Sequence, residues 1–384
     1  MAATNSGEVV IVGGGIIGCL TAYFLSVRGV RPVVVEADAI ASGASGTSGG
    51  WLTPYSHDCD PAMIALSPVT LALHRELAEA LPEETGIDHG FEETPYLRCA
   101  LTEDGAADLL EWHTARTYEG AVMDWLAPAE AKALTPWLTA DLVGAIRSDN
   151  EPTLDSYRLT VSAMQAAEKH GARVVTGKVV GLATEGVGSA GRRSSGVRLE
   201  DGTEVLGDAV LLAMGPWTGQ ASEWIGAPLP ITPQRGQMVY LAAPSDGEGP
   251  DLEVGLSAVD TGGSILSKRL TDTIVAATRE DVGFDRSTTT AARDWLLKRA
   301  ATLSDRVMGA GISGQTACLR PLTPDGKPYV GAAPGWENVH IAAGHASEGI
   351  HYGPVTAMAM ADLIINGTSD IDVSALDPGR ASSG

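Results

Sequence analysis

The stretch that decides the fold is Val9-Val10-Ile11-Val12-Gly13-Gly14-Gly15-Ile16-Ile17-Gly18. Its β-branched half predicts a buried strand, and its glycines predict a tight turn into a helix that ends before Gly29. A second apolar run, Pro32 to Val35, predicts the next parallel strand. The stretch therefore indicates a βαβ unit, the first part of a Rossmann-like sheet.

The glycine turn has the spacing of a dinucleotide site. Gly13, Gly15 and Gly18 follow the first strand directly, and Glu36 ends the second one. The glycines let the backbone approach a pyrophosphate at the helix N-terminus, and the Glu36 carboxylate can accept hydrogen bonds from a ribose diol. Because FAD and NAD both bury these groups, the fingerprint leaves the choice between them open.

Composition excludes several classes of protein. The chain has 384 residues, with 26 Lys and Arg against 48 Asp and Glu, and its net charge of −22 argues against a nucleic-acid partner. Hydrophobic residues make up 44% of the chain and charged residues 19%, which is typical of folded globular proteins. No apolar run approaches the roughly 18 residues of a membrane span. The four cysteines form no CxxC pair, which favours a reducing, cytoplasmic location.

The remaining patterns predict further helices and strands. A helical stretch is expected at 60–81 and another at 157–170, with a strand at 209–214 that stops at Gly215. The stretch 186–196, rich in Gly, Ser and Arg, is expected to be an exposed loop tip. The polar residues 367–384 are expected to form a loose tail.

Four later segments carry more specific information: VLLAMGPWTG (210–219), ITPQRGQMVYL (231–241), CLRPLTPDGKPYVG (318–331) and NVHIAAGHASEGIHYGP (338–354). Together they resemble the D-amino acid oxidase-like FAD-dependent oxidoreductases, most closely glycine oxidase and monomeric sarcosine oxidase. The resemblance implies FAD and an α/β fold with two domains. A Rossmann-like FAD-binding domain would comprise 1–50, 145–225 and 315–384, and an antiparallel-sheet α+β substrate-binding domain 51–144 and 226–314.

The fingerprint and the resemblance together predict the residues that contact FAD. The turn between Gly344 and Gly353 is glycine-rich, and the amides of Gly349 and Ile350 are expected to face N1 and the C2 carbonyl of the flavin, where they would stabilise the charge of its reduced form. The full set is Gly13, Gly15, Ile16, Ile17, Gly18, Glu36, Ala37, Ser42, Thr47, Ser48, Gly49, Val180, Gly215, Trp217, Arg320, Gly344, Ser347, Glu348, Gly349 and Ile350.

Arg320 and Tyr240 are the candidate catalytic residues. The resemblance implies that Arg320 holds a substrate carboxylate through two parallel hydrogen bonds, whereas most arginines are surface ion-pair residues. Tyr240 could cap the substrate pocket with its hydroxyl, or simply pack on an apolar strand. Cys318 stands where sarcosine oxidases carry a cysteine bonded to flavin, while glycine oxidases bind FAD without a bond; both remain open. No metal is expected, because the spacing of His345, Glu348 and His351 spreads them around a helix.

The resemblance implies a flavoenzyme that oxidises the carbon–nitrogen bond of a small amino acid, glycine or an N-alkyl or N-carboxymethyl glycine. A hydride would pass from the α-carbon to flavin N5, water would hydrolyse the imine to glyoxylate and an amine, and oxygen would reoxidise the flavin to give hydrogen peroxide. One alternative is an FAD-dependent dehydrogenase that reduces a quinone or protein acceptor. Others are an NAD-dependent dehydrogenase and a hydrolase using Ser48 in a GxSxG pattern. The expected partner is a small amine or amino acid, and a homo-oligomer is left open.

Overall fold

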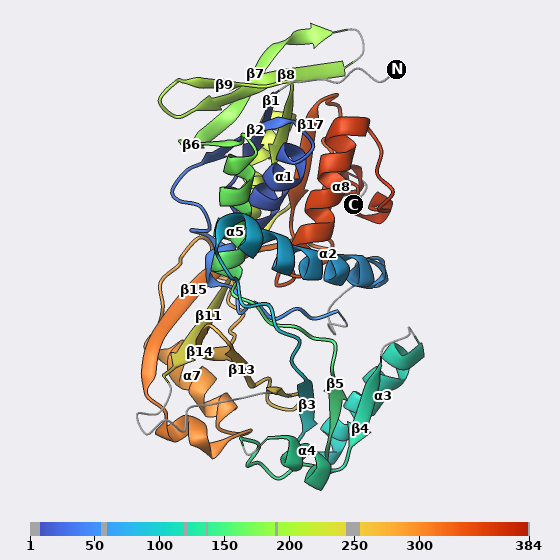
Figure 1. Ribbon diagram of the computed structural model, residues 1–384, viewed down its shortest axis with the longest axis vertical. Helices are drawn as coiled ribbons and strands as arrows, with labels where there is room; N and C mark the ends of the chain where they lie inside the picture. The colour runs from blue at the N-terminus through green and yellow to red at the C-terminus, as the bar shows by residue number, and fades with distance from the viewer. Residues whose placement is uncertain are drawn as a thin grey trace.

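The computed structural model describes residues 8–54, 60–118, 122–135, 137–188, 191–242 and 254–382. Within these residues the strands form three sheets, one of six strands, one of eight and one of three. Figure 1 shows the six-stranded sheet in the upper half of the molecule and the eight-stranded sheet in the lower half, with the three-stranded sheet at the top. The chain passes between the two large sheets several times.

The six-stranded sheet contains the predicted βαβ unit. Its strands lie in the order β16-β17-β10-β1-β2-β6, and they are parallel except for β16. These strands are β1 (Glu8–Val12), β2 (Arg31–Glu36), β6 (Arg173–Thr176), β10 (Ala209–Leu212), β16 (Tyr329–Ala332) and β17 (Val339–Ala343).

Alternation along β1 explains the layers on the two faces of this sheet. Ile11 packs into the cluster formed with helices α1 (Ile16–Ser26), α5 (Ser156–Lys169) and α8 (Gly353–Asn366). Val10 and Val12 point to the opposite face. There they meet the sheet of β7 (Val179–Gly188), β8 (Gly191–Leu199) and β9 (Glu204–Leu206), together with η2 (Gly215–Ala221) and α6 (Ser222–Ile225).

Two fingerprint glycines are required by packing within the chain. Gly13 has φ +113°, and a Cβ there would lie 2.4 Å from the Ala213 carbonyl oxygen. A Cβ on Gly18 would lie 2.0 Å from the Gly13 carbonyl oxygen. Both contacts are with backbone atoms that cannot turn away, so only glycine lets α1 begin directly after β1 and beside β10.

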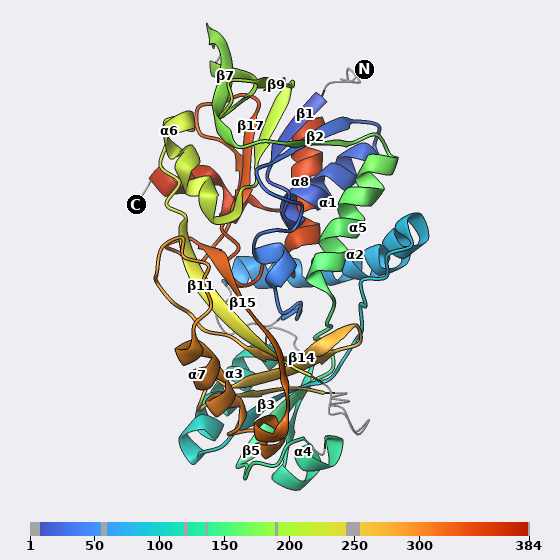
Figure 2. The ribbon, with the colours of Figure 1, turned by 90° about the vertical axis from the view of Figure 1, so that its left-hand side faces the viewer.

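The eight-stranded sheet has the order β15-β11-β14-β13-β12-β3-β5-β4 and is antiparallel except where β12 pairs with β3. Figure 2 shows β11 and β15 rising from it toward the upper half. Helices α3 (Glu103–Tyr118), α4 (Pro128–Leu134) and α7 (Thr290–Ala300) pack against this sheet. Its strands are β3 (Tyr96–Ala100), β4 (Met123–Leu126), β5 (Gly144–Ser148), β11 (Thr232–Leu241), β12 (Gly255–Ala258), β13 (Ser264–Lys268), β14 (Thr271–Ala276) and β15 (Ile312–Leu322).

Helix α2 (Pro61–Thr85) crosses the molecule between the two halves (Figure 1). The Asp60 side chain caps its first turn by accepting from the Ala62 amide at 2.9 Å. Gly86, with φ +75°, ends it in the left-handed region. None of the described helices is long and apolar enough to cross a bilayer.

The predicted α/β fold with a second, antiparallel sheet is confirmed, while the domain boundaries stay a prediction. Two local predictions were wrong. The expected loop tip contains most of β8, because Asn338 bonds both the amide and the carbonyl of Ser194 and so extends the hairpin. The expected loose tail is packed, since Leu376 is 1% exposed and Arg380 binds Asp325.

Buried histidines predict acid sensitivity. Burial lowers the pKa of His74, His89 and His340 to about 4 and that of His345 to about 3. Between about pH 6.5 and pH 4 the unfolded chain therefore binds protons that the folded chain does not, so stability falls as the pH falls. In urea unfolding at pH 7 and pH 5, His89→Leu should reduce this loss by about 1–2 kcal/mol. His113→Gln, at a half-buried ring, is the control. If the free energy of unfolding falls equally between pH 7 and pH 5 in the His89 variant and the wild type, His89 does not contribute to the acid sensitivity.

Candidate active site

A cavity of about 1490 Å³ lies where the glycine turn, the ends of β11 and β15 and the turn after β17 meet. Most of the predicted cofactor residues line it: Gly13, Gly15, Ile16, Ile17, Glu36, Ala37, Ser42, Thr47, Ser48, Gly49, Gly215, Trp217, Arg320, Ser347, Glu348, Gly349 and Ile350. These residues are far apart in sequence, and the two large sheets bring them together.

Four predicted residues do not line the cavity. Gly18 packs against the glycine turn. Val180 directly follows three residues that line the cavity, Gly177, Lys178 and Val179. Gly344, with φ +96°, lies so close to Thr323 that a Cβ on this glycine would be 2.5 Å from Thr323 Cγ2. The Tyr240 hydroxyl lies 3.5 Å from Thr316 Oγ1, and its ring packs with a neighbouring apolar cluster. The structure therefore favours the packing interpretation of Tyr240.

The β1–α1 turn presents hydrogen-bond donors to the cavity. Glu36 Oε2 accepts from the Gly14 amide at 2.6 Å, and Ser45 Oγ accepts from the Ile16 amide at 2.9 Å. Among the described residues, none accepts from the amides of Gly15 and Ile17, which belong to the first turn of α1. Such a helix terminus favours a phosphate group.

The loop 42–50 lines the cavity beside this turn. It includes Ser42, Thr47, Ser48 and Gly49, which were predicted to contact FAD, and also Ser45, which was not. The hydrolase alternative finds no support here. Ser48 Oγ accepts from the Gly50 amide at 3.2 Å, and no histidine of the described chain is bonded to it.

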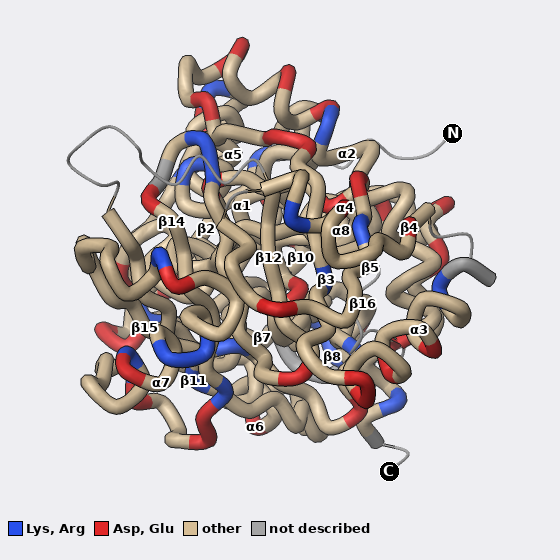
Figure 3. Tube along the Cα trace, turned by 90° about the horizontal axis from the view of Figure 1, so that it is seen from below, with Lys and Arg blue, Asp and Glu red and all other residues tan. Residues whose placement is uncertain are grey.

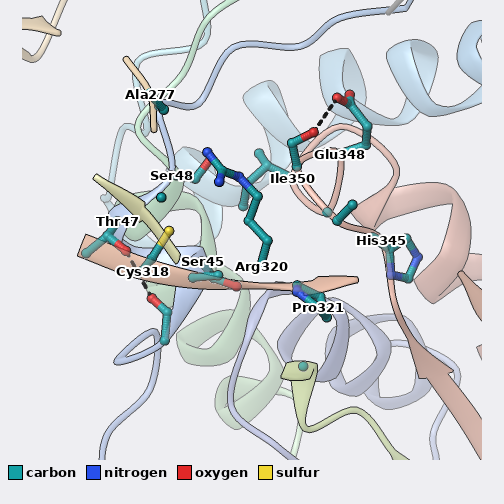
Figure 4. Close-up of a pocket in the computed structure, with 18 of the residues that line it drawn as sticks. Ser45, Thr47, Ser48, Ala277, Cys318, Arg320, Pro321, His345, Glu348 and Ile350 are labelled. Atoms are coloured by element: carbon teal, nitrogen blue, oxygen red, sulfur yellow. Dashed lines mark hydrogen bonds between the residues drawn. The ribbon is translucent and has the colours of Figure 1, made fainter. Parts of the chain in front are cut away.

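Arg320 projects from β15 into the cavity. Figure 4 shows its guanidinium directed away from β15, toward Ser48, with the Cys318 sulfur on the same side of the strand. Its Nη1 donates to the Thr278 carbonyl at 2.9 Å, and no other acceptor in the described part of the chain is bonded to the guanidinium, so its other donors can bind a ligand. Burial lowers the pKa of Arg320, and neighbouring Arg279 acts in the same direction, yet an arginine stays protonated at neutral pH. Arg320 therefore faces the cavity, and the carboxylate-binding role implied for it stays a prediction.

A local cation matters because the chain as a whole is acidic. Figure 3, viewed from below, shows acidic and basic positions interspersed along the chain trace. The overall charge of −22 does not attract an anion, so a carboxylate would be drawn only by cations such as Arg279 and Arg320 at the cavity itself.

Gly236 makes room for this guanidinium. It lies on β11, and a Cβ there would sit 2.4–2.5 Å from Nη2, Cζ and Nη1 of Arg320. Gly236→Ala should push the guanidinium out of place and lower kcat/KM for the substrate by about 10- to 100-fold, because small displacements of a positioning group are costly. Folding should be little affected, since the flexible end of Arg320 can move.

The matched control is Gly314→Ala on the partner strand, where a Cβ would meet only Tyr240 Cδ2 at 3.7 Å, an ordinary contact. Equal steady-state kinetics for the Gly236 and Gly314 variants would contradict this role of Gly236.

The wall of the cavity near the lower sheet is apolar. Met238, Leu266 and Ile274 line it and belong to one packed cluster. Trp51 also lines it and stacks on Tyr96 with ring centroids 3.9 Å apart. An amine placed here would lose water, which favours its unprotonated form.

Glu348 and the two histidines nearest to it have separate partners. Glu348 Oε2 accepts from Thr53 Oγ1 at 2.7 Å. His345 Nε2 lies 3.0 Å from Thr356 Oγ1, and His351 Nε2 lies 3.3 Å from Ser67 Oγ. Within the described residues no cluster of three metal-ligating side chains occurs.

Comparison with known proteins identifies the family. The model of the family of FAD dependent oxidoreductases matches residues 8–363. The chain belongs to this family. The oxidoreductase is 31% identical over 363 residues to glycine oxidase from Geobacillus kaustophilus, covering 94% of this chain and 93% of the relative. It is 29% identical over 389 residues to glycine oxidase from Pseudomonas aeruginosa, covering 97% and 99%. The crystal structure of glycine oxidase from Geobacillus kaustophilus matches it with a TM-score of 0.87 at 29% identity, covering 97% and 98%.

The cofactor of the oxidoreductase is FAD, which removes the NAD alternative, and the cavity fits it. The α1 N-terminus would hold the pyrophosphate through the amides of Gly15 and Ile17, and Glu36 lies on the turn where the ribose is expected. The flavin would then lie between Arg320 and the turn 345–350. The chain is therefore an FAD-dependent oxidoreductase.

Proposed function

We propose that this oxidoreductase oxidises glycine or an N-substituted glycine, N-alkyl or N-carboxymethyl, at its carbon–nitrogen bond. The observation that carries the proposal is the half-buried Arg320 side chain, whose guanidinium faces the same cavity as the glycine turn. The names of the relatives support it, since two that are about 30% identical over nearly the whole chain are glycine oxidases.

Arg320 would bind the substrate carboxylate through its remaining donors and so fix the orientation of the α-carbon. The apolar wall of Met238, Leu266 and Ile274 would receive the amine or its substituent and keep it unprotonated. Bound FAD supplies the acceptor for the hydride and passes the electrons to oxygen, giving hydrogen peroxide. Hydrolysis of the imine product would give glyoxylate and an amine.

The turn 345–350 would lie against the flavin. Gly349 and Ile350 line the cavity, and among the described residues none accepts a hydrogen bond from their amides. Those donors are suited to the negative charge that appears when the flavin is reduced.

The decisive experiment is anaerobic mixing of the yellow holoenzyme with glycine, sarcosine, bulkier N-carboxymethyl amines and D-alanine. Bleaching of the flavin absorbance by one or more of the glycine derivatives is expected, with D-alanine slower. If no member of this series bleaches the flavin, the proposed substrate class is wrong.

A second measurement separates an oxidase from a dehydrogenase. With air as the only acceptor, an oxidase forms one hydrogen peroxide for each amine released. Turnover that depends on an added quinone or protein acceptor, with little peroxide, would instead support the dehydrogenase alternative.

The attachment of FAD can be checked directly. The Cys318 thiol is free and lines the cavity, so a covalent link is sterically open, but non-covalent FAD is the expected outcome. Acid precipitation should leave the yellow colour in the supernatant for the wild type and Cys318→Ser alike. Colour that stays with the wild-type pellet and not with the Cys318→Ser pellet would show a covalent bond.

A further inference from the structure

Three polar side chains on one face of α2 hold the turn that follows β17. Ser67, Thr70 and His74 are spaced three and four residues apart and are 1%, 0% and 0% exposed. Thr70 Oγ1 donates to the His351 carbonyl at 2.6 Å. His74 Nε2 lies 3.0 Å from the same oxygen and 3.1 Å from the Ile350 carbonyl. A helix that does not itself line the cavity thus binds the backbone of the cavity wall.

The acceptors determine where the hydrogens lie. Because both partners of His74 Nε2 are carbonyl oxygens, Nε2 carries the ring hydrogen, and burial lowers the pKa of His74 to about 4, so the ring is neutral. Ser67 Oγ donates its single hydrogen to the Pro54 carbonyl at 3.0 Å, and therefore accepts from Tyr352 Oη, also at 3.0 Å. Thr70 and His74 on α2 thus donate to carbonyls of this turn, and Ser67 accepts from the Tyr352 hydroxyl.

These bonds act on the turn from the side away from the cavity. Ile350 lines the cavity, while its carbonyl is held by α2. Within the turn, the Tyr352 amide donates to the Glu348 carbonyl at 2.9 Å. The Glu348 carboxylate also accepts from the Thr53 hydroxyl. With its carbonyls fixed on the α2 side, the turn keeps the amides of Gly349 and Ile350 at the cavity.

We propose that Ser67, Thr70 and His74 are positioning residues for the flavin. By fixing the 349–352 turn they hold the Gly349 and Ile350 amides where the charge of the reduced ring develops, and so raise the preference of the site for reduced over oxidised FAD. This inference depends on the proposed function in one respect only, which is that the 349–352 turn contacts the flavin ring.

The test is the reduction potential and the dissociation constant of FAD in the purified holoenzyme and its variants. Thr70→Val keeps the side-chain volume and removes one donor. It should weaken binding of reduced relative to oxidised FAD about tenfold, which is a potential about 30 mV more negative for a two-electron couple. His74→Leu removes the donor to both carbonyls and should shift the potential further. His74→Gln, which retains an N–H, should recover part of the shift.

Glu79→Gln, on the exposed face of α2, is the matched control and should leave the potential unchanged. Wild-type potentials in both Thr70→Val and His74→Leu would overturn the inference while leaving the proposed function intact. If His74→Leu does not fold, Thr70→Val alone decides. A wild-type protein that takes up no FAD would overturn both proposals.

Discussion

Replacing Arg320 by Met is expected to lower kcat/KM for the amino-acid substrate by about 10- to 100-fold. The Arg320 side chain is half-buried and its guanidinium donates to the Thr278 carbonyl, so the substrate carboxylate would replace water at its remaining donors and form charged hydrogen bonds. Loss of such bonds costs about 1.5–3 kcal/mol. Stopped-flow reduction of the flavin under anaerobic conditions measures the effect without the oxygen step.

Two controls make this result specific. Arg320→Lys keeps the charge but cannot form two parallel bonds, so it should fall between the wild type and the Met variant. An amine without a carboxylate should be oxidised slowly by all three, with little difference between them. Unchanged kinetics of Arg320→Met with the amino acid would remove Arg320 from the substrate site.

Replacing Arg98 by Met is expected to destabilise the fold by about 3–5 kcal/mol, the cost of leaving a buried charge without its partner. Arg98 forms two bonds to Glu151, at 2.5 and 2.8 Å, and the two side chains are 10% and 0% exposed. Its guanidinium also lies 4.7 Å from the ring centroid of Trp112. The Met side chain fills similar space but leaves the Glu151 carboxylate buried and unpaired.

Urea unfolding of the wild type, Arg98→Met and the double variant Arg98→Met/Glu151→Met checks this. The double variant should recover much of the loss, because it removes the orphaned charge together with its partner. If the double variant is no more stable than Arg98→Met, the loss comes from packing and not from the unpaired carboxylate.

The parts of the site that follow from local rules could be predicted from the sequence. Gly13 and Gly18 are required by contacts within one βαβ unit, so their spacing carries the information. The contact of Ser45 with the Ile16 amide was not predicted, because it joins the 42–50 loop to the glycine turn across the fold and not along the chain.

The rest depends on contacts that no local pattern encodes. The approach of Arg320 to Gly236 requires the register of the β11–β15 ladder, in which Gln234 and not Gly236 is opposite Arg320. The bonds from α2 to the 350–352 turn join residues more than 270 positions apart. The tail 367–384 was wrongly predicted to be loose because its composition is mostly polar. The buried residue Leu376 and the distant ion pair between Arg380 and Asp325 hold it in place.

The strand order of the six-stranded sheet has a consequence for synthesis on the ribosome. β1 is hydrogen-bonded to β10, and β10 in turn to β17, so the centre of the sheet needs residues from both ends of the chain. A nascent polypeptide halted before Val339 has no β17 to pair with the edge of β10. It also lacks helix α8, which packs against α1 and covers one face of the sheet. Such a truncated product would expose an unpaired strand edge, and it should aggregate or be degraded during translation.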